Sequence, residues 1–305
     1  MKKFAFLSWA VVAALFFTAC ESSPKGYSVV DGVIVFDAPA RAEGQHSVLR
    51  LTTDPIPVVR VGFIGLGMRG PGAVERFTYL DGVEIKALCD LYPDRVEKSQ
   101  EILAGRNLPA AAAYSGEEGW KELCRRDDID LVYICTPWQL HVPMAVYAME
   151  HGKHVAVEVP AAMSLEECWQ LVDTAEKTQR HCMMLENCVY DFFELTTLNM
   201  AQHGLFGEII HTEGSYIHDL DPFWEHYQGN WRLDFNQSHR GDVYATHGLG
   251  PACQLLDIHR GDRMTRLVSM DTESINGLKT AKEKMGAETF ANGDQTLTLI
   301  KTEKG

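Results

Sequence analysis

Apolar and polar residues alternate in blocks along the chain after residue 57. Short apolar runs rich in β-branched residues have the pattern of strands that are buried on both faces of a parallel sheet. Longer amphipathic segments with helical spacing separate these runs. We expect strands at 58–65, 83–90, 111–114, 130–137, 153–160 and 181–187, and helices at 70–80, 93–103, 116–125, 141–150 and 164–179.

The last of these helices carries a clear start signal. Ser164 is followed three residues later by Glu167, which is the spacing of a capping box. Strands that alternate with helices are typical of βαβ units. Residues 58–187 therefore predict an α/β domain of the Rossmann type, with a doubly wound parallel sheet.

The pattern changes after Asn187, where we place the start of a second domain at 188–305. A helix is expected at 190–203, and 207–218 has strand-like alternation. An irregular stretch rich in Trp, His, Asp and Tyr then runs to about Tyr244. The last residues, 295–305, have the alternation of a strand that is cut off after a turn.

The N-terminus has the features of an export signal. Lys2 and Lys3 precede an apolar segment, 4–17, that is too short to span a bilayer comfortably. Small residues then lead to Cys20, as in a bacterial lipoprotein signal. We expect a signal peptide at 1–20 with Cys20 lipidated, and a tether and N-terminal extension at 21–57; a plain signal peptide or a buried helix is the alternative. The protein would be exported and lipid-anchored to the bacterial cell membrane.

Charge and cysteine content exclude several classes of protein. The net charge of −14 argues against a nucleic-acid partner and against a polybasic membrane surface. None of the eight cysteines forms a CxxC pair, so zinc ribbons are not expected and buried, unpaired thiols are. His218 and Asp219, with Asp221 and His226, have no standard metal-ligand spacing. No metal is expected, and the oligomeric state stays open, a homo-oligomer included.

A dinucleotide-binding motif follows the first strand. Gly65, Gly67 and Gly70 form GxGxxG between a strand and a helix, where glycines let the backbone approach a pyrophosphate. Asp90 ends the next strand, 20 residues after Gly70, and is placed to accept hydrogen bonds from both ribose hydroxyls. A carboxylate there repels a 2′-phosphate, so NAD is favoured over NADP, although Arg69 lies in the same loop. A glycine-rich turn in an unrelated α/β domain is the alternative.

Three later strand ends are expected on the same side, because ligands bind at the carboxyl ends of parallel strands. They are the segments TPWQLH at 136–141, Glu158-Val159-Pro160 and Glu186-Asn187.

These motifs resemble those of the glucose–fructose oxidoreductase / inositol dehydrogenase superfamily, whose members carry GxGxxG, TPxxxH and Glu-Lys-Pro segments. Val159 stands here in place of the catalytic lysine, and valine cannot shuttle a proton. This departure argues against simple dehydrogenase chemistry.

Within that superfamily the chain resembles glycoside hydrolase family 109, through segments such as GNWR at 229–232 and YATHGLGP at 244–251. The resemblance implies NAD-dependent α-N-acetylgalactosaminidase activity and a second, α+β domain with an open, mostly antiparallel sheet. The family's chains continue beyond the position of Gly305, so we expect that domain to be incomplete. The implied NAD contacts are Met68, Arg69, Asp90, Trp138, Gln139, Leu140, His141, Glu158, Val159, Asn187 and Tyr244. The implied substrate contacts are Tyr216, Arg232, Tyr244, Ala245, Thr246 and His247.

The chemistry that the resemblance implies begins with transfer of a hydride from C3 of the sugar to NAD⁺. The resulting ketone acidifies the C2 proton, the aglycone leaves by elimination, water adds at C1, and the hydride returns. Tyr244 and His247 are expected to be the proton-transfer pair. The substrate would be a glycan, and the membrane would be contacted only through the lipid anchor. The alternatives are a periplasmic sugar oxidoreductase of the same superfamily and a non-catalytic, sugar-binding lipoprotein.

Overall fold

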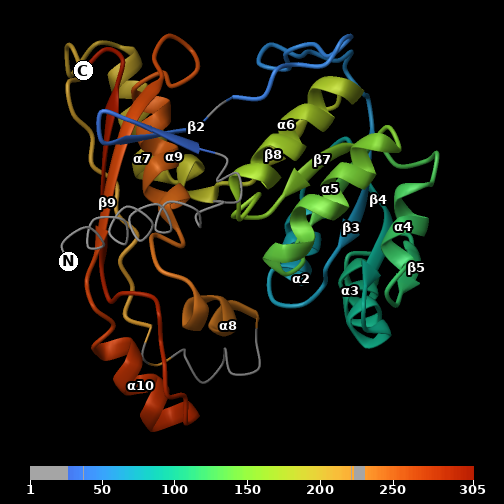
Figure 1. Ribbon diagram of the computed structural model, residues 1–305. Coiled ribbons are helices and arrows are strands. Elements are labelled where there is room, and N and C mark those ends of the chain that lie inside the picture. Colours follow the sequence, from blue (N-terminus) through green and yellow to red (C-terminus); the bar gives the residue numbers. More distant parts are fainter. Residues whose placement is uncertain (1–26, 37, 221, 223–230) are drawn as a thin grey trace, which may run out of the picture. The chain divides into compact units, whose positions relative to one another are not determined.

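The computed structural model describes four stretches of the chain (Figure 1), namely residues 27–36, 38–220, 222 and 231–305. The signal peptide expected at 1–20 and the lipidated Cys20 lie outside these stretches and stay predictions. No helix within the described stretches is both long and apolar enough to cross a membrane. The chain divides into two compact units, with the boundary between Glu43 and Gly44.

The described part of the first unit contains a β-hairpin. Strands β1 (Tyr27–Val30) and β2 (Val33–Phe36) are antiparallel, with Val30 opposite Val33. The turn between them is Asp31-Gly32, and both residues have positive φ angles, 51° and 78°. A two-residue turn of this kind matches the twist of the strands it joins. The expected tether therefore includes regular structure.

The second unit contains a six-stranded parallel sheet in the order β5-β4-β3-β6-β7-β8. The chain starts at β3, builds outward to β5, and then returns to the other side of β3 with β6. This is the doubly wound topology that the sequence predicts. The strands are β3 (Val59–Ile64), β4 (Val83–Asp90), β5 (Ala112–Ser115), β6 (Leu131–Ile134), β7 (His154–Val157) and β8 (Cys182–Met184).

Helices connect these strands and cover both faces of the sheet (Figure 1). Phe63 of β3 packs with residues of α2 and α3, and its neighbour Ile64 packs with residues of α4, α5 and α6. Successive side chains of a strand point to opposite faces, so each helical layer has its own core. The helices are α2 (Gly70–Phe77), α3 (Pro93–Gly105), α4 (Gly119–Cys124), α5 (His141–Glu150) and α6 (Leu165–Thr178), with the 3₁₀ turn η1 (Trp138–Leu140) before α5.

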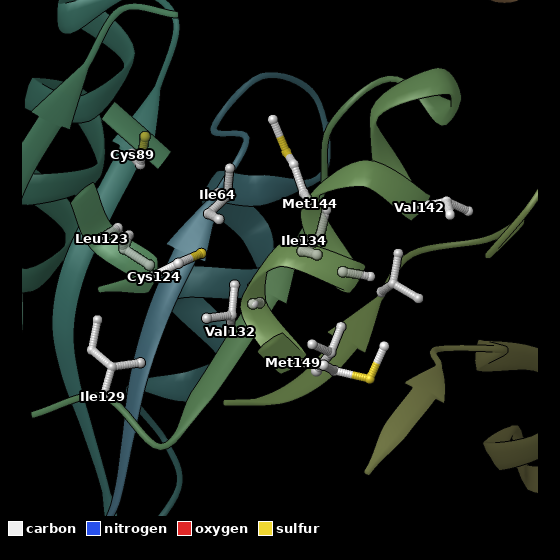
Figure 2. Packing of buried hydrophobic residues seen from close by; sticks show 14 of the residues in the cluster. Ile64, Cys89, Leu123, Cys124, Ile129, Val132, Ile134, Val142, Met144 and Met149 are labelled. Atoms are coloured by element: carbon white, nitrogen blue, oxygen red, sulfur yellow. The ribbon is translucent and has the colours of Figure 1, made fainter. Parts of the chain in front are cut away.

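Figure 2 shows the core on one face of the sheet. Ile64, Val132 and Ile134 from the strands meet Leu123 of α4 and Met149 of α5, and all five side chains are at most 2% exposed. Burial of this kind contributes about 1.5–3 kcal/mol for each large side chain. The packed sheet is therefore a rigid support for the loops at its carboxyl edge.

The capping box that the sequence predicts is confirmed at the start of α6. The Ser164 hydroxyl accepts a hydrogen bond from the N–H of Glu167 at 3.1 Å. The Glu167 carboxylate accepts in return from the N–H of Met163 at 2.7 Å, one residue before the cap. Two N–H groups at the start of the helix are thereby satisfied.

After β8 the chain forms helices and a small antiparallel sheet, in which β9 pairs with β10. This pairing agrees with the predicted α+β class of the second domain and with the strand expected near the end of the chain. The elements are η2 (Asn187–Tyr190), α7 (Phe192–Gln202), α8 (Trp231–Ser238), α9 (Ala245–Leu255), β9 (Met264–Asp271), α10 (Asn276–Met285) and β10 (Thr296–Thr302).

The prediction of a strand at 207–218 is wrong. None of these residues belongs to a strand, and β9 and β10 pair only with each other among the described strands. The segment packs against a helix instead. A Cβ at Gly214 would lie 2.2 Å from the carbonyl oxygen of Gly248 in α9, so the two backbones are in direct contact.

The seven described cysteines are unpaired, as expected. Cys89 and Cys124 are buried, and burial raises the pKa of each thiol to about 12. Cys168 differs from the expectation, because it is exposed on α6.

Candidate functional site

The loop after β3 is shaped by its glycines. Gly65 has a φ of +91°, and a Cβ there would lie 2.7 Å from the backbone carbonyl of Cys135, just after β6. A Cβ at Gly70 would lie 2.0 Å from the carbonyl oxygen of Gly65. Both contacts exclude a side chain, so the loop brings the start of α2 close to the reversal of strand order between β3 and β6. No side chain caps α2 at Arg69, which suits a bound pyrophosphate.

Asp90 ties this loop to the end of β4. Its Oδ2 accepts a hydrogen bond from the N–H of Leu66 at 2.6 Å, and its Oδ1 accepts from the N–H of Tyr92 at 3.0 Å. Arg95 lies 3.4 Å from Oδ1. A carboxylate has about four acceptor positions, so three protein donors leave room for a further hydroxyl. The contact between Asp90 and a ribose stays a prediction, and the structure adds a role in holding the loop.

The glycine loop also contacts the end of β7. Arg69 Nε lies 3.7 Å from Glu158 Oε1, and the Tyr133 hydroxyl donates to the same oxygen at 3.2 Å. The structure therefore brings together two predicted cofactor residues from different strand ends. Met68, between Gly67 and Arg69, is 75% exposed.

His141, by contrast, is occupied by the protein. Its Nδ1 lies 2.7 Å from the carbonyl oxygen of Pro160, and its Nε2 lies 2.8 Å from that of Thr136. Burial lowers the pKa of His141, which is 1% exposed. The imidazole thus links the ends of β6 and β7, and its side chain has no polar atom left for a ligand. The predicted NAD contact of His141 stays a prediction, and the structure adds a role in joining these two strand ends.

Trp138, at the start of η1, connects the cofactor side to the second domain. It is 3% exposed, and its ring lies 4.4 Å from that of Trp231 and 5.4 Å from that of Tyr244. Val159 belongs to the same cluster and is 8% exposed. An apolar residue at position 159 fits this aromatic environment, and an ammonium group there would be desolvated. Gln139 and Leu140, the other predicted contacts of η1, are exposed.

The predicted substrate residues come together at the start of α9. Tyr244 is the N-cap residue of α9, and His247 lies in the first turn of that helix. The rings of Tyr244 and His247 are stacked, with centroids 5.2 Å apart and planes at 11°. Tyr216 stacks on Tyr244 at 4.9 Å and on His247 at 5.0 Å. These three rings form one stack.

Arg232 of α8 completes this group. Its guanidinium donates a hydrogen bond to the Tyr244 hydroxyl and lies 4.9 Å from the centre of the Tyr244 ring. A guanidinium in this position stabilises negative charge on the phenol oxygen. Tyr216, Arg232, Tyr244 and Ala245 line the wall of a hollow of about 1750 Å³. This hollow extends to residues of β9 and β10, and His247 is not among the residues that line it.

Two residues contact His247, namely Glu186, which the sequence places at the cofactor edge, and Cys188, which it does not single out. Glu186 Oε1 lies 2.7 Å from His247 Nδ1, and Cys188 Sγ lies 3.5 Å from the same nitrogen. Burial raises the pKa of Cys188 to about 11, and the neighbouring Glu186 carboxylate adds to this effect. One atom from each of the three residues lies within 4.8 Å of the others, which is close enough for metal ligands. The expected absence of a metal therefore stays a prediction.

Three buried side-chain atoms near the site have no hydrogen-bond partner among the described residues, namely Thr136 Oγ1, Glu186 Oε2 and Thr246 Oγ1. Thr136 follows β6, beside Gly65. Buried polar atoms are normally satisfied, so an unpaired hydroxyl beside the glycine loop suits a site that a bound dinucleotide completes. Together with the backbone contact of Gly65 and Gly70, this hydroxyl fits NAD.

Two family models match successive parts of the chain. Residues 59–186 match the family model described as an oxidoreductase family with an NAD-binding Rossmann fold. Residues 190–305 match the model of the C-terminal domain of glycosyl hydrolase 109. A relative from Bacteroides fragilis, glycosyl hydrolase family 109 protein 1, is 62% identical over 299 residues.

The chain belongs to glycosyl hydrolase family 109. The Bacteroides fragilis relative aligns with 97% of this chain, and a family 109 protein of Porphyromonas gingivalis is 61% identical and aligns with 98%. The chain spans 64% of the length of each of these relatives. The Rossmann domain identifies NAD as the cofactor of this family 109 chain, as its motifs predict.

Solved structures agree on the fold. The myo-inositol 2-dehydrogenase of Lactobacillus plantarum superposes with a TM-score of 0.61 at 18% sequence identity, over 81% of this chain and 67% of the other. A myo-inositol dehydrogenase from Sinorhizobium meliloti, described as putative, superposes with a TM-score of 0.59 at 17% identity, over 81% of this chain and 67% of the other. The family 109 chain thus shares the fold of these oxidoreductases.

Proposed function

We propose that this protein is a glycosidase that releases terminal α-linked N-acetylgalactosamine from glycans by transient oxidation at C3 of the sugar. Bound NAD supplies the hydride acceptor for C3 and returns the hydride at the end of the cycle. The protein must then provide proton transfer at the C3 hydroxyl, at C2 and at the leaving oxygen. The observation that carries the proposal is the stack of Tyr216, Tyr244 and His247, next to Trp138 at the cofactor edge.

Tyr244 and His247 are the proposed proton-transfer pair. The parallel stacking of their rings places two groups that exchange protons side by side. Arg232 donates to the Tyr244 hydroxyl and so favours the form of Tyr244 that accepts a proton. Tyr216 covers both rings and gives the sugar an aromatic wall. Ala245 and Thr246 lie between the pair and supply backbone and hydroxyl contacts.

The test uses the product of the complete natural gene, because the chain spans 64% of the length of its relatives. The purified protein is incubated in heavy water with 4-nitrophenyl α-N-acetylgalactosaminide and no added cofactor. We expect nitrophenol release and deuterium at C2 of the product sugar. Release without deuterium at C2 would count against the oxidation–elimination route.

The superfamily offers a second candidate function, a sugar oxidoreductase, which is supported by the fold shared with inositol dehydrogenases. Val159 argues against it, since valine cannot exchange a proton where the superfamily has lysine. Accumulation of NADH on free sugars without nitrophenol release would favour the oxidoreductase. If the protein forms neither NADH nor nitrophenol but still binds sugar, a sugar-binding lipoprotein would be favoured.

The proposed location follows from the sequence. A signal peptide ending before Cys20 would export the protein and attach it to the bacterial membrane through a lipid, where it reaches glycans outside the cytoplasm. Metabolic labelling with a tagged palmitate would test the anchor. Labelling that persists in Cys20→Ser would contradict it.

A further inference from the structure

Glu186 occupies a central position behind the ring stack. It lies after β8 and caps η2, where its Oε1 accepts a hydrogen bond from the N–H of Cys188 at 3.0 Å. The same oxygen lies 2.7 Å from His247 Nδ1. The side chains of Glu186 and His247 are only 6% and 12% exposed. A buried carboxylate held by the backbone is thus directed at one nitrogen of a residue from a distant helix.

We infer that Glu186 is a positioning residue, which keeps the proton of the neutral His247 imidazole on Nδ1 and so leaves the lone pair on Nε2 for proton transfer. A carboxylate can only accept hydrogen bonds, so His247 Nδ1 must be the donor. A neutral imidazole carries one N–H, and Nε2 is then the acceptor. The catalytic part of this inference rests on the proposed function; the tautomer does not.

The sequence of α9 supports this contact. The helix contains Gly248, Gly250 and Pro251, which are among the residues least favourable for a helix interior. A Cβ at Gly250 would lie 2.8 Å from Cγ of Glu186. The glycine therefore lets the helix approach the carboxylate closely enough for His247, one turn earlier, to reach it.

Cys188 does not replace Glu186 in this role. Its thiol is the weaker partner at 3.5 Å, and its pKa of about 11 keeps it protonated at neutral pH. A neutral sulfur is a weak hydrogen-bond acceptor, whereas a carboxylate forms short, strong hydrogen bonds. Tyr216 and Tyr244 stack on the imidazole and hold its plane, and Glu186 then selects which nitrogen carries the proton.

The direct test is the ¹⁵N chemical shifts of the imidazole, which distinguish the two neutral tautomers. The complete gene product is labelled with ¹⁵N-histidine, and the His247 signals are identified by their loss in His247→Gln. At pH 8 we expect the Nδ1–H form in the unmodified protein. A predominant Nε2–H form in that protein would overturn the inference, whether or not any variant folds.

Variants of Glu186 distinguish its positioning of His247 from the general effect of removing a buried carboxylate. Glu186→Ala removes the acceptor and should shift His247 toward Nε2–H, with a fall in kcat of roughly 10- to 100-fold, as expected when a proton-transfer group is misplaced. Glu186→Gln keeps an acceptor oxygen and should restore the Nδ1–H form and much of kcat, with little change in KM. The matched control is Glu176→Ala, which removes another buried carboxylate, 3% exposed on α6, and should leave the His247 signals unchanged.

The outcomes also separate this inference from the proposed function. If the unmodified protein has the Nδ1–H form and Glu186→Ala loses it, but no glycoside is cleaved, the proposed function fails and the positioning role of Glu186 stands. Glycosidase activity with an unchanged tautomer in Glu186→Ala would overturn the positioning role alone. If the His247 tautomer changes in Cys188→Ala but not in Glu186→Ala, the thiol orients the imidazole. This outcome would also overturn the positioning role of Glu186.

Discussion

Gly70 begins α2 against the carbonyl group of Gly65, and a Cβ at position 70 would lie 2.0 Å from that oxygen. No rotamer relieves such a contact, because both partners are backbone atoms. A side chain at this position must therefore displace the loop that is expected to bind the pyrophosphate.

Gly70→Ala is expected to weaken NAD binding by about 10-fold or more, equivalent to roughly 1.4 kcal/mol, because the displaced loop no longer fits the pyrophosphate. Isothermal titration calorimetry with NAD measures the change. Gly105→Ala is the control, since a Cβ at the end of α3 meets no atom within 4 Å. Equal dissociation constants for the two variants would contradict the role of the loop.

Asp90→Asn is expected to reduce both the affinity for NAD and the preference for NAD over NADP. The carboxylate accepts from the N–H of Leu66 in the glycine loop, and its negative charge opposes a 2′-phosphate. Measured dissociation constants for the two cofactors give the ratio. Asp94→Asn removes an exposed carboxylate from the first turn of α3 and should leave that ratio unchanged. A ratio that stays constant in Asp90→Asn would argue against this recognition.

The sheet and the glycine loop could be predicted because their signals are local. The strands of the parallel sheet are mostly apolar runs, and GxGxxG has a fixed context between strand and helix. The segment at 207–218 shows the limit of such patterns. Its alternation is that of a strand, but a strand also needs a partner, and this segment contacts α9 at Gly214 and pairs with no described strand.

Two other features were missed for different reasons. Asp31-Gly32, between apolar residues, is a recognisable hairpin signal that the interpretation of 21–57 as a tether left out. Glu186 was placed at the cofactor edge from its position after a strand, but its partner His247 is 61 residues away. A side-chain pair so distant in sequence has no local signal.

Phe63→Ala is expected to destabilise the Rossmann domain by about 3–5 kcal/mol. Phe63 is fully buried, and its ring lies 5.1 Å from that of Tyr133 and 5.2 Å from that of Phe77. Urea unfolding measures the loss. Phe193→Ala is the matched control, because Phe193 is 77% exposed, and its free energy of unfolding should change little. Similar losses in both variants would mean that Phe63 does not support the core.

The ion pair of Arg60 and Asp130 predicts a pH dependence of stability. The Arg60 guanidinium donates to Asp130 at 2.6 and 2.9 Å, and this hydrogen bonding lowers the pKa of Asp130 below its ordinary 3.8. A lowered pKa in the folded state stabilises the protein above about pH 4, and this contribution disappears as the pH falls through the lowered value. Asp130→Asn should therefore lower the urea midpoint at pH 7.

The difference between Asp130→Asn and the unmodified protein should shrink steadily below pH 4, as Asp130 becomes protonated in both states of the unmodified protein. Asp81→Asn, which alters an exposed carboxylate before β4, serves as the control and should show no pH-dependent difference. A difference that grows on acidification would have the wrong sign and would exclude the ion pair as its cause.

Tyr244→Phe and His247→Ala are each expected to lower the glycosidase kcat by about 100-fold or more, within the range that positioned acids and bases contribute. Both variants should still bind NAD with nearly unchanged affinity, because the glycine loop and Asp90 are intact. Stopped assays with the nitrophenyl substrate and calorimetry with NAD measure the two properties separately. Tyr79→Phe and His203→Ala alter exposed residues far from α9 in sequence and should retain full turnover. If both Tyr244→Phe and His247→Ala turn over substrate at the rate of the unmodified protein, the proton-transfer pair has no part in the mechanism. If the variants lose NAD binding, their loss of activity reflects a change in structure.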